Sequence, residues 1–369
     1  MKILVTGASG FVGKNLVATL NHLGHTVLAY DRNNSLEELE NYASQAEVVV
    51  HLAGINRPTD PEEFKKGNVG FTELLCNALA KNNNKAPILV SSSIQAALDN
   101  DYGRSKREGE TVLINHMEQM DAKVWIYRFS NLFGKWSRPH YNTVIATWCH
   151  AISRNEPIHV NDPSISLNLM YIDDVVLEIM RAINGSPTVV EGVYCTVPTS
   201  YDVTLGEIAD LLHSFKESRN SLFVPNLKEG FEKKLYSTYL SFLPKDEFNY
   251  FLDMKCDDRG SFTEFLKSPD RGQVSINISK PGITKGNHWH HSKNEKFLVV
   301  SGQGCIQFRD IFETEIIEYH VTGEKLEVID IPTGYTHNII NTGDTDLITV
   351  MWVNEPFDPD TPDTHYLEV

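Results

Sequence analysis

A tyrosine and a lysine stand four residues apart, as Tyr102 and Lys106, in the segment DYGRSK, the spacing of neighbours on one helix face. A phenol with its usual pKa near ~10 is a weak acid at neutral pH. An adjacent ammonium favours the phenolate and lowers that pKa, so Tyr102 could protonate a carbonyl undergoing reduction. Just upstream, LVSSS ends a hydrophobic run, and Ser93, in preference to Ser92, is predicted to hydrogen-bond the same oxygen. Taken alone, YxxxK is a frequent accident, with an ordinary aromatic and a solvated charge as the alternative.

A glycine-rich turn, VTGASGFVG, lies between a predicted strand and a predicted helix near the N-terminus. Its glycines let the backbone approach a pyrophosphate, whose charge the first amides of the helix meet. Asp31 ends the next predicted strand, where a carboxylate accepts hydrogen bonds from an adenosine ribose. Asp31 favours NAD, whereas Arg32 could bind the 2′-phosphate of NADP or remain a solvated charge. We therefore predict a dinucleotide site, with Lys106 reaching the nicotinamide ribose.

A second chemical grouping lies nearer the C-terminus, where GNHWHHSKNEK crowds three histidines and a glutamate together. His288 and His290 are two apart on a predicted strand and should point to one face. Glu295 follows in the next segment, and His337 comes from the distant segment PTGYTHNIIN. Three imidazoles and a carboxylate suit Zn²⁺, with Mn, Fe and Ni as alternatives, and leave room for water or substrate. These four side chains could form a metal site, or the clustered histidines could be structural or surface-exposed.

Two kinds of element must position these groups. Up to about residue 215, short β-branched runs alternate with longer amphipathic stretches, which predicts a doubly wound parallel sheet with helices on both faces. Helices are expected at 204–217, with Thr204 as N-cap, and at 228–243. Beyond about residue 250, short alternating strands broken by Gly, Pro, Asn and Asp predict an all-β barrel or sandwich. The predicted domains are residues 1–245 and 252–369.

Charge and cysteine content exclude several classes of protein. The chain has 33 Lys and Arg against 49 Asp and Glu, a formal charge of −16, which disfavours nucleic-acid binding and adhesion to anionic lipid. An anionic ligand must therefore be held by local groups. Five cysteines without a CxxC pair indicate neither a disulfide framework nor a thiolate zinc site. The N-terminal apolar run is too short for a signal peptide, and no segment approaches membrane-spanning length, so we expect a cytoplasmic protein without membrane insertion.

The first 240 or so residues resemble the extended short-chain dehydrogenase/reductase family. Its landmarks occur in order: TGxxGxxG, the strand-end acid, HLAG, GNVGFT with Asn68, the hydroxyl run, YxxxK, RFSNLFG and YIDDV. The resemblance implies a Rossmann-type fold, a nicotinamide cofactor with NADPH favoured, and contact between Asn131 and a nucleotide sugar. One departure is SISLNLM, which replaces a segment that usually contains arginine. The cofactor-binding residues implied are Gly7, Gly10, Phe11, Val12, Gly13, Asp31, Arg32, Leu52, Ala53, Gly54, Tyr102 and Lys106.

The C-terminal segment resembles the cupin family. G-x5-HxH-x4-E-x6-G begins at Gly282, and PxGxxHxxxN begins at Pro332, although Leu326 replaces an expected glycine. The resemblance implies a jelly-roll barrel holding the four predicted ligands. In addition, DDRGSFTE followed by QVSINISKPGITKGNHWH resembles the start of the nucleotide-sugar 3,5-epimerases, which are themselves cupins. That likeness implies a catalytic role for His288, as base, ligand or both, and a substrate contact for Arg259.

The two sites make a logical reaction sequence. A hydrogen at C3 of a 4-keto sugar is acidic because the resulting carbanion is delocalised as an enolate, and reduction of the ketone removes that acidity. The cupin must stabilise an enolate through the metal, a histidine, Lys285 or Lys296. The reductase must stabilise an alkoxide through Tyr102 and Ser93.

The domain order resembles the bifunctional enzymes of capsular polysaccharide synthesis in the UDP-N-acetyl-L-fucosamine pathway. The resemblance implies C3 epimerisation of UDP-2-acetamido-2,6-dideoxy-L-arabino-hexos-4-ulose at a zinc-bearing cupin. NADPH-dependent C4 reduction to UDP-2-acetamido-2,6-dideoxy-L-talose would follow, in a homodimer. The alternatives are a single-activity NAD(P)H-dependent 4-ketosugar reductase, whose cupin is structural or dimerising, and a non-catalytic NADP sensor. Intact Tyr102 and Lys106 argue against the sensor, which needs no proton donor.

Overall fold

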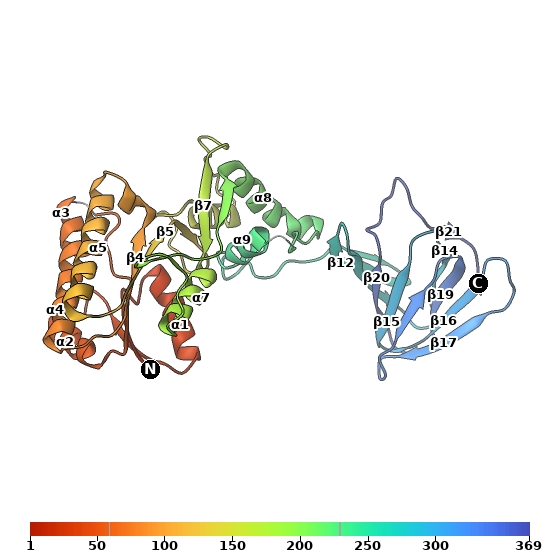
Figure 1. The fold of residues 1–369 in the computed structure, drawn as a ribbon. Helices are drawn as coiled ribbons and strands as arrows, with labels where there is room; N and C mark the ends of the chain where they lie inside the picture. The colour runs from red at the N-terminus through yellow and green to blue at the C-terminus, as the bar shows by residue number, and fades with distance from the viewer. Residues whose placement is uncertain (59, 229) are drawn as a thin grey trace. The chain divides into compact units, whose positions relative to one another are not determined.

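The computed structural model describes residues 1–58, 60–228 and 230–369 and forms two compact units. The first unit contains residues 1–212 and the segment that ends at Leu243, and the second contains residues 213–228 and 244–369. Helices and strands alternate through the first unit, whereas strands make up most of the second (Figure 1).

A seven-stranded sheet in the order β2-β1-β3-β4-β5-β9-β8 forms the centre of the first unit. All its neighbouring strands are parallel except the last pair, β9 and β8. The strands are β1 (Lys2–Thr6), β2 (Thr26–Tyr30), β3 (Val48–His51), β4 (Ile88–Ser93), β5 (Val124–Phe129), β8 (Val189–Glu191) and β9 (Tyr194–Cys195). The predicted doubly wound parallel sheet is confirmed.

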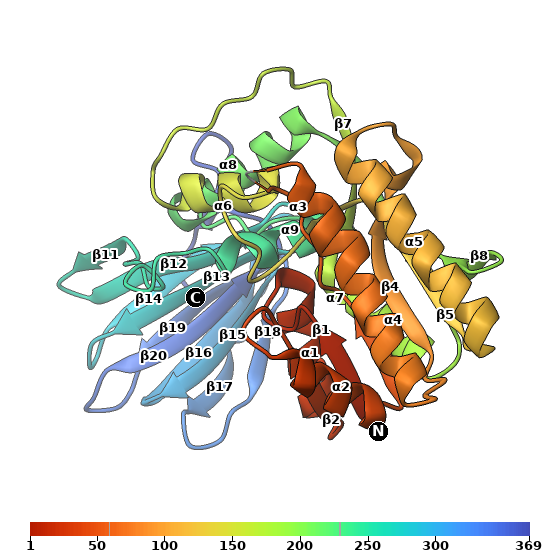
Figure 2. The same ribbon diagram turned by 90° about the vertical axis from the view of Figure 1, so that its left-hand side faces the viewer.

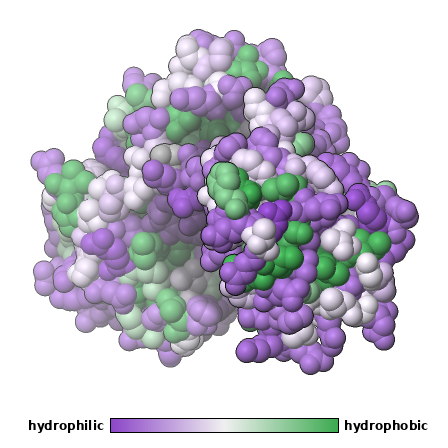
Figure 3. Space-filling view, turned by 90° about the vertical axis from the view of Figure 1, so that its right-hand side faces the viewer, coloured by the Kyte–Doolittle hydropathy of each residue, from purple (hydrophilic) through white to green (hydrophobic). Residues whose placement is uncertain are grey.

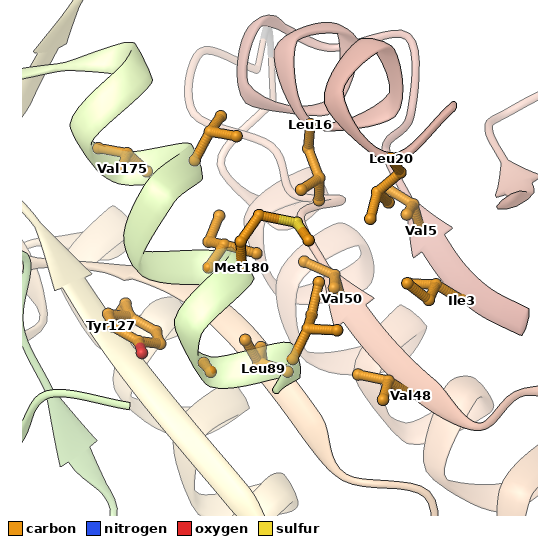
Figure 4. Packing of buried hydrophobic residues seen from close by; sticks show 14 of the residues in the cluster. Ile3, Val5, Leu16, Leu20, Val48, Val50, Leu89, Tyr127, Val175 and Met180 are labelled. Carbon is orange, nitrogen blue, oxygen red and sulfur yellow. The ribbon is translucent and has the colours of Figure 1, made fainter. Parts of the chain in front are cut away.

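Helices cover both faces of this sheet. On one face, Leu16 and Leu20 of α1 and Met180 of α7 gather against Ile3, Val5 and neighbouring strand residues (Figure 4). Helices α2, α4 and α5 cover the other face (Figure 2). Their leucines pack against Leu4, Val49 and Ile88. Because alternate strand residues point to opposite faces, both faces of the strands are apolar. The helices are α1 (Phe11–His22), α2 (Leu36–Gln45), α4 (Phe71–Lys81), α5 (Asp101–Met120) and α7 (Ile172–Ile183).

Smaller elements complete the first unit, and α8 runs on into the second. A three-stranded sheet has the order β10-β7-β6. The helix predicted at 204–217 is α8, and Thr204 is its N-cap as predicted, since Oγ1 of Thr204 accepts from the Glu207 amide at 3.2 Å. The helix predicted at 228–243 is α9, and residue 229 within that span lies outside the described residues. The remaining elements are α3 (Glu62–Phe64), η1 (Lys65–Gly70), η2 (Ile94–Ala97), β6 (Asn131–Phe133), α6 (Val144–Ser153), β7 (Ser166–Tyr171), β10 (Tyr201–Thr204), α8 (Leu205–Ser221) and α9 (Gly230–Leu240).

Two antiparallel sheets form most of the second unit, in the orders β11-β12-β13-β20-β15-β18 and β17-β16-β19-β14-β21. An apolar core joins them, with Phe297 and Leu347 from the first sheet and Ile306, Phe308 and Ile339 from the second. This arrangement confirms the predicted all-β, cupin-like barrel. The strands are β11 (Met254–Asp257), β12 (Gly260–Ser268), β13 (Gly272–Ser279), β14 (Thr284–Trp289), β15 (Glu295–Ser301), β16 (Gln303–Asp310), β17 (Ile317–Thr322), β18 (Val328–Ile331), β19 (Tyr335–Asn341), β20 (Leu347–Val353) and β21 (His365–Tyr366).

Hydrophilic side chains cover most of the face drawn in Figure 3. On the face drawn in Figure 3, apolar side chains form small separate patches among hydrophilic ones. Among the described residues, none of the helices combines the length and apolar character that a bilayer crossing requires.

Candidate functional site

The glycine loop lies between β1 and α1. Gly7 has a φ of +70°, which few residues other than glycine adopt. A Cβ on Gly13 would lie 2.2 Å from the carbonyl oxygen of Gly7, so only glycine allows this close approach. No side chain caps α1 at Gly10, and Phe11 and Val12 begin the helix. Helix amides without a side-chain cap fit the predicted pyrophosphate site.

Asp31 is fastened to this loop, a contact that the sequence analysis missed. Its carboxylate accepts from the amide of Ser9 at 3.0 Å and from the Ser9 hydroxyl at 2.9 Å. Arg32 follows it and is exposed. The carboxylate therefore helps to hold the loop, while the guanidinium remains accessible to a ligand.

Tyr102 lies in the first turn of α5, next to the end of β4. The side chain of Asn100 caps the helix by accepting from the Gly103 amide at 2.7 Å. The Ser93 hydroxyl lies near enough to the Tyr102 phenol to lower its pKa as a hydrogen-bonding neighbour, and it accepts from the Gln95 amide at 3.2 Å. Ser92, by contrast, is buried and donates to the carboxylate of Glu110, in the next part of α5. The structure thus brings Ser93 to Tyr102 and turns Ser92 away, because adjacent strand residues point to opposite faces.

The acidity of Tyr102 differs from the expectation. Burial raises the pKa of Tyr102, and the Ser93 hydrogen bond lowers it only in part. Lys106 does not offset this, since its Nζ lies 6.0 Å from the Tyr102 ring centroid and donates to the carbonyl of Ser91 at 3.0 Å. Loss of hydration lowers the pKa of Lys106 to about 8, although Glu110 opposes this. The predicted lowering of the tyrosine pKa is corrected: the phenol stays protonated, as a proton donor requires.

A π-helix, η1, carries Asn68, which holds the segment next to Lys106. Asn68 lies within it and is buried, accepting from the Ile55 amide at 2.8 Å and donating to the Ile55 carbonyl at 3.0 Å. It also donates to Ser105 in α5 at 2.9 Å. A Cβ on Gly54 would lie 3.1 Å from Nζ of Lys106. Gly54, which follows the end of β3, therefore lies beside the lysine.

Two aromatic residues near Tyr102, Tyr141 and Phe64, were not predicted from the sequence. The Tyr141 hydroxyl donates to the side chain of Asn56 at 2.7 Å, and Tyr141 contributes to the raised pKa of Tyr102. The Phe64 ring lies 5.6 Å from the Tyr102 ring. Asn131 begins β6 and donates to the Asn168 carbonyl at 3.2 Å. No spacing pattern links Tyr141 or Phe64 to Tyr102, since only the fold brings them together, whereas Asn131 was predicted from its motif and is hydrogen-bonded to β7.

The second candidate site joins three strands or strand ends of the cupin-like unit. His288 on β14 pairs in register with His337 on β19. The sequence analysis expected simple strand alternation, but β14 has a bulge between Gly286 and His288, and His290 follows the end of the strand. Such a bulge redirects side chains. The potential ligand atoms of His288, His290, Glu295 and His337 all lie within 4.8 Å of one another.

Burial and unpaired atoms make these four residues suitable for a cation. His290 and His337 are 2% and 1% exposed, and Nε2 of each, with Oε2 of Glu295, has no hydrogen-bond partner among the described residues. Oε2 lies 3.2 Å from Nε2 of His337 and 3.7 Å from Nε2 of His290 without hydrogen-bond geometry. Unpaired buried polar atoms are costly unless a ligand satisfies them. The donor set therefore fits the predicted metal.

The protonation states agree with that fit. Burial raises the pKa of Glu295, but its imidazole neighbours outweigh burial and hold the pKa well below its usual range. Burial also lowers the pKa of His288 to about 4, so the imidazole is neutral at pH 7. Nδ1 of His290 hydrogen-bonds the carbonyl of Asp363, which leaves Nε2 facing the cluster. Ionised carboxylate and neutral imidazole are the forms that bind metals.

A cavity of about 390 Å³ opens onto this cluster, within the usual size range for ligand sites. The predicted residues Arg259 and Lys285 line it. Lys296 does not line the cavity. Because Glu295 points inward, the next residue on β15, Lys296, points outward, and its ammonium pairs with Asp330. The structure thus does not bring Lys296 to the cavity. The lining is Lys255, Asp257, Arg259, Ser261, Phe262, Asn277, Lys285, Gly286, His288, Glu295, Phe297, His337, Ile339 and Met351.

Each of the two units contains a segment that matches a protein-family model. Residues 3–192 match the NAD dependent epimerase/dehydratase family model. The chain belongs to this family. Residues 255–365 match a second model, the polysaccharide biosynthesis C-terminal domain. Membership in the NAD-dependent epimerase/dehydratase family implies a nicotinamide cofactor, which agrees with the glycine loop and the Tyr102 site.

Relatives cover the full length. The chain is 45% identical to the UDP-2-acetamido-2,6-beta-L-arabino-hexul-4-ose reductase of Pseudomonas aeruginosa over 370 residues, covering 100% of this chain and 99% of the relative. A crystal structure of the capsular polysaccharide assembling protein CapF from Staphylococcus aureus shares 58% identity and a TM-score of 0.95, with full coverage of both chains. UDP-glucose 4-epimerase from Thermotoga maritima, at 20% identity, covers 66% of this chain and 98% of its own with a TM-score of 0.56, a likeness of fold.

Proposed function

We propose that this chain is a bifunctional nucleotide-sugar enzyme of capsular polysaccharide synthesis. The cupin epimerises C3 of UDP-2-acetamido-2,6-dideoxy-L-arabino-hexos-4-ulose, and the reductase site then reduces C4 to the L-talose derivative. The observation that carries the proposal is the cupin cavity of about 390 Å³ over a buried, unpaired His/Glu cluster, on the same chain as a Ser-Tyr-Lys reductase site. The reductase named among the relatives supports the second step.

At the reductase site, Tyr102 donates its proton to the C4 oxygen as the carbonyl becomes an alkoxide. Ser93 hydrogen-bonds the same oxygen, and the Lys106 ammonium supplies positive charge nearby. Bound NADPH would supply the hydride. Asn131, on the substrate side, is proposed to contact the nucleotide sugar.

At the cupin site, the neutral imidazole of His288 is proposed to remove the C3 proton of the 4-keto sugar. The Lys285 ammonium, held at the cavity wall, stabilises the enolate oxygen by its charge. His290, Glu295 and His337 would hold Zn²⁺, which would supply Lewis acidity to a bound oxygen, while His288, the predicted fourth ligand, would be uncoordinated when it acts as the base. Delivery of a proton from solvent to the opposite face of C3 completes the epimerisation, and His288 returns its proton to solvent. The later reduction of C4 then removes the acidity of C3 and makes the inversion permanent.

A second candidate is a single-activity 4-ketosugar reductase whose cupin is structural or dimerising. The name of the Pseudomonas aeruginosa relative favours it, because that name gives a reductase alone. Deuterium exchange separates the two candidates. In D₂O with the 4-keto substrate and no reduced cofactor, the bifunctional enzyme incorporates deuterium at C3, and His288→Ala abolishes this. Absence of deuterium in the wild type supports the single-activity reductase and overturns the proposal.

We also propose the cofactor, the metal, the oligomeric state and the location of the enzyme. NADPH is preferred to NADH because Arg32 is exposed beside Asp31, whose carboxylate is bound to Ser9. Zinc is the expected metal, the protein is expected to be a cytoplasmic homodimer, and its substrate is a UDP-sugar rather than a nucleic acid.

A further inference from the structure

Three cationic side chains line the cupin cavity. They differ in how many of their N–H donors are already hydrogen-bonded to protein acceptors. The Lys285 ammonium donates to Oδ1 of Asn277 at 2.9 Å and to the carbonyls of Ile278 at 2.8 Å and Ser261 at 3.3 Å. An ammonium has three donors, so these protein acceptors use all of them. Lys285 therefore contributes a fixed charge to the wall of the cavity rather than a free donor.

Arg259 is also largely engaged. Its Nε and Nη2 donate to one carboxylate oxygen of Asp257, at 3.0 Å and 2.6 Å, and its amide donates to the other oxygen at 2.9 Å. The pair neutralises most of the guanidinium charge at the edge of the cavity, and only the Nη1 side remains for a ligand. Arg259 is thus positioned by Asp257.

Lys255 is the remaining cation of the lining, and no motif in the sequence pointed to it. It lies on β11, the edge strand of its sheet, directly opposite Phe262 on β12, which is opposite Asn277 on β13. Directly paired residues share one face of a sheet, so Lys255 lies on the face that bears these other cavity residues. It is exposed, and across the described parts of the chain its ammonium has neither a hydrogen bond nor an ion pair.

We propose that Lys255 binds the diphosphate of the nucleotide sugar at the rim of the cupin cavity. This inference rests on the proposed epimerase function. In a chain with a net charge of −16, an anionic ligand needs a local cation, and Lys255 is the lining cation whose donors are free. A lysine binds phosphate as a point charge through charge-assisted hydrogen bonds. The ketosugar ring then lies inward, toward Lys285 and His288, and the diphosphate lies outward.

The test is the KM for deuterium incorporation at C3, measured without reduced cofactor so that the cupin reaction alone is observed. We expect Lys255→Ala to raise this KM about tenfold while changing kcat less than about twofold, because the lost contact lies away from the reacting carbon. Lys255→Arg keeps the charge and should stay within about threefold of the wild type. Lys325→Ala is the matched control, since Lys325 is an exposed lysine of the same unit outside the cavity lining. The wild-type KM should also rise with salt, more steeply than that of Lys255→Ala.

The outcomes separate this inference from the function on which it rests. If the wild type exchanges deuterium but Lys255→Ala has the same KM as Lys325→Ala, Lys255 is a solvated surface charge and its binding role is overturned. If the wild type exchanges no deuterium at C3, the epimerase function fails and this inference fails with it. A tenfold higher KM in Lys255→Ala, with near-normal values in Lys255→Arg and Lys325→Ala, supports it.

Discussion

The two candidate sites of this chain are assembled in opposite ways. Tyr102 and Lys106 are one helical turn apart on α5, so local geometry brings them near each other. His288 and His337 are separated by 48 residues along the chain, and only the pairing of β14 with β19 brings them together. The comparison teaches that one site depends on a helix and a strand end, whereas the other depends on the closed barrel. A substitution should therefore be able to inactivate one site while the other stays active.

The largest expected effect separates the chemistry of the two sites. Tyr102→Phe removes the proposed proton donor and should slow cofactor oxidation by about 10²–10⁴-fold. Deuterium exchange at C3 should remain within twofold of the wild type, because it takes place in the other unit. Steady-state cofactor oxidation and NMR detection of exchange measure the two rates. Normal reduction by Tyr102→Phe would show that another group is the acid.

Removal of a predicted ligand tests the barrel site. His337→Ala should reduce bound metal to below ~0.1 per chain and lower the free energy of unfolding of the second unit by about 3 kcal/mol, as for loss of a ligand present at about 100 times its Kd. Elemental analysis and thermal unfolding, with and without chelator, measure these changes. His291→Ala is the matched control, because His291 is an exposed neighbour outside the cluster. Equal metal content in the two variants would contradict the assignment.

The pH dependence of the reduction rate should reflect Lys106, which belongs to the reductase site and not to the cupin site. Its pKa is lowered to about 8, so the ammonium is present below that pH and is lost above it. Reduction should therefore fall about tenfold per pH unit above pH 8, because the charged form supports the reaction. Lys106→Arg, if active, should lack this decline, since a guanidinium stays charged. A flat wild-type profile up to pH 10 would argue against a role for the ammonium.

Cofactor choice should respond to Arg32. Arg32→Ala removes the accessible guanidinium beside Asp31 and should lower kcat/KM for NADPH about tenfold, with little change for NADH. Initial rates with each cofactor give the ratio. Arg57→Ala serves as a control for general loss of positive charge, and equal losses with both cofactors would exclude contact with the 2′-phosphate.

The smallest expected effect concerns Lys296. Because it points out of the barrel and pairs with Asp330, Lys296→Ala should change C3 exchange less than twofold and the free energy of unfolding by less than about 1 kcal/mol. Exchange kinetics and denaturant titration measure both. A tenfold loss of C3 exchange would instead show that Lys296 takes part in the cupin reaction, as the sequence predicted.

Much of the fold was predictable because hydrophobic period and capping are local signals. The parallel sheet, the change to an all-β unit and the Thr204 cap all follow from such signals. Side-chain direction was less predictable. The bulge before His288 and the outward direction of Lys296 depend on register with β19, β18 and β20, which adjacent residues do not encode. The effect of burial on the Tyr102 pKa likewise depends on distant packing.

By itself, the sequence determined the residue types and their short spacings: the glycine turn, the Tyr102–Lys106 pair and the histidines before Glu295. These are local because a helix turn or a strand end sets them. The tertiary structure decided which hydroxyl reaches Tyr102, which lysines line the cupin cavity and which of those keeps a free charge. Such choices depend on burial and cross-strand register, and these exist only once segments far apart in the chain have packed together.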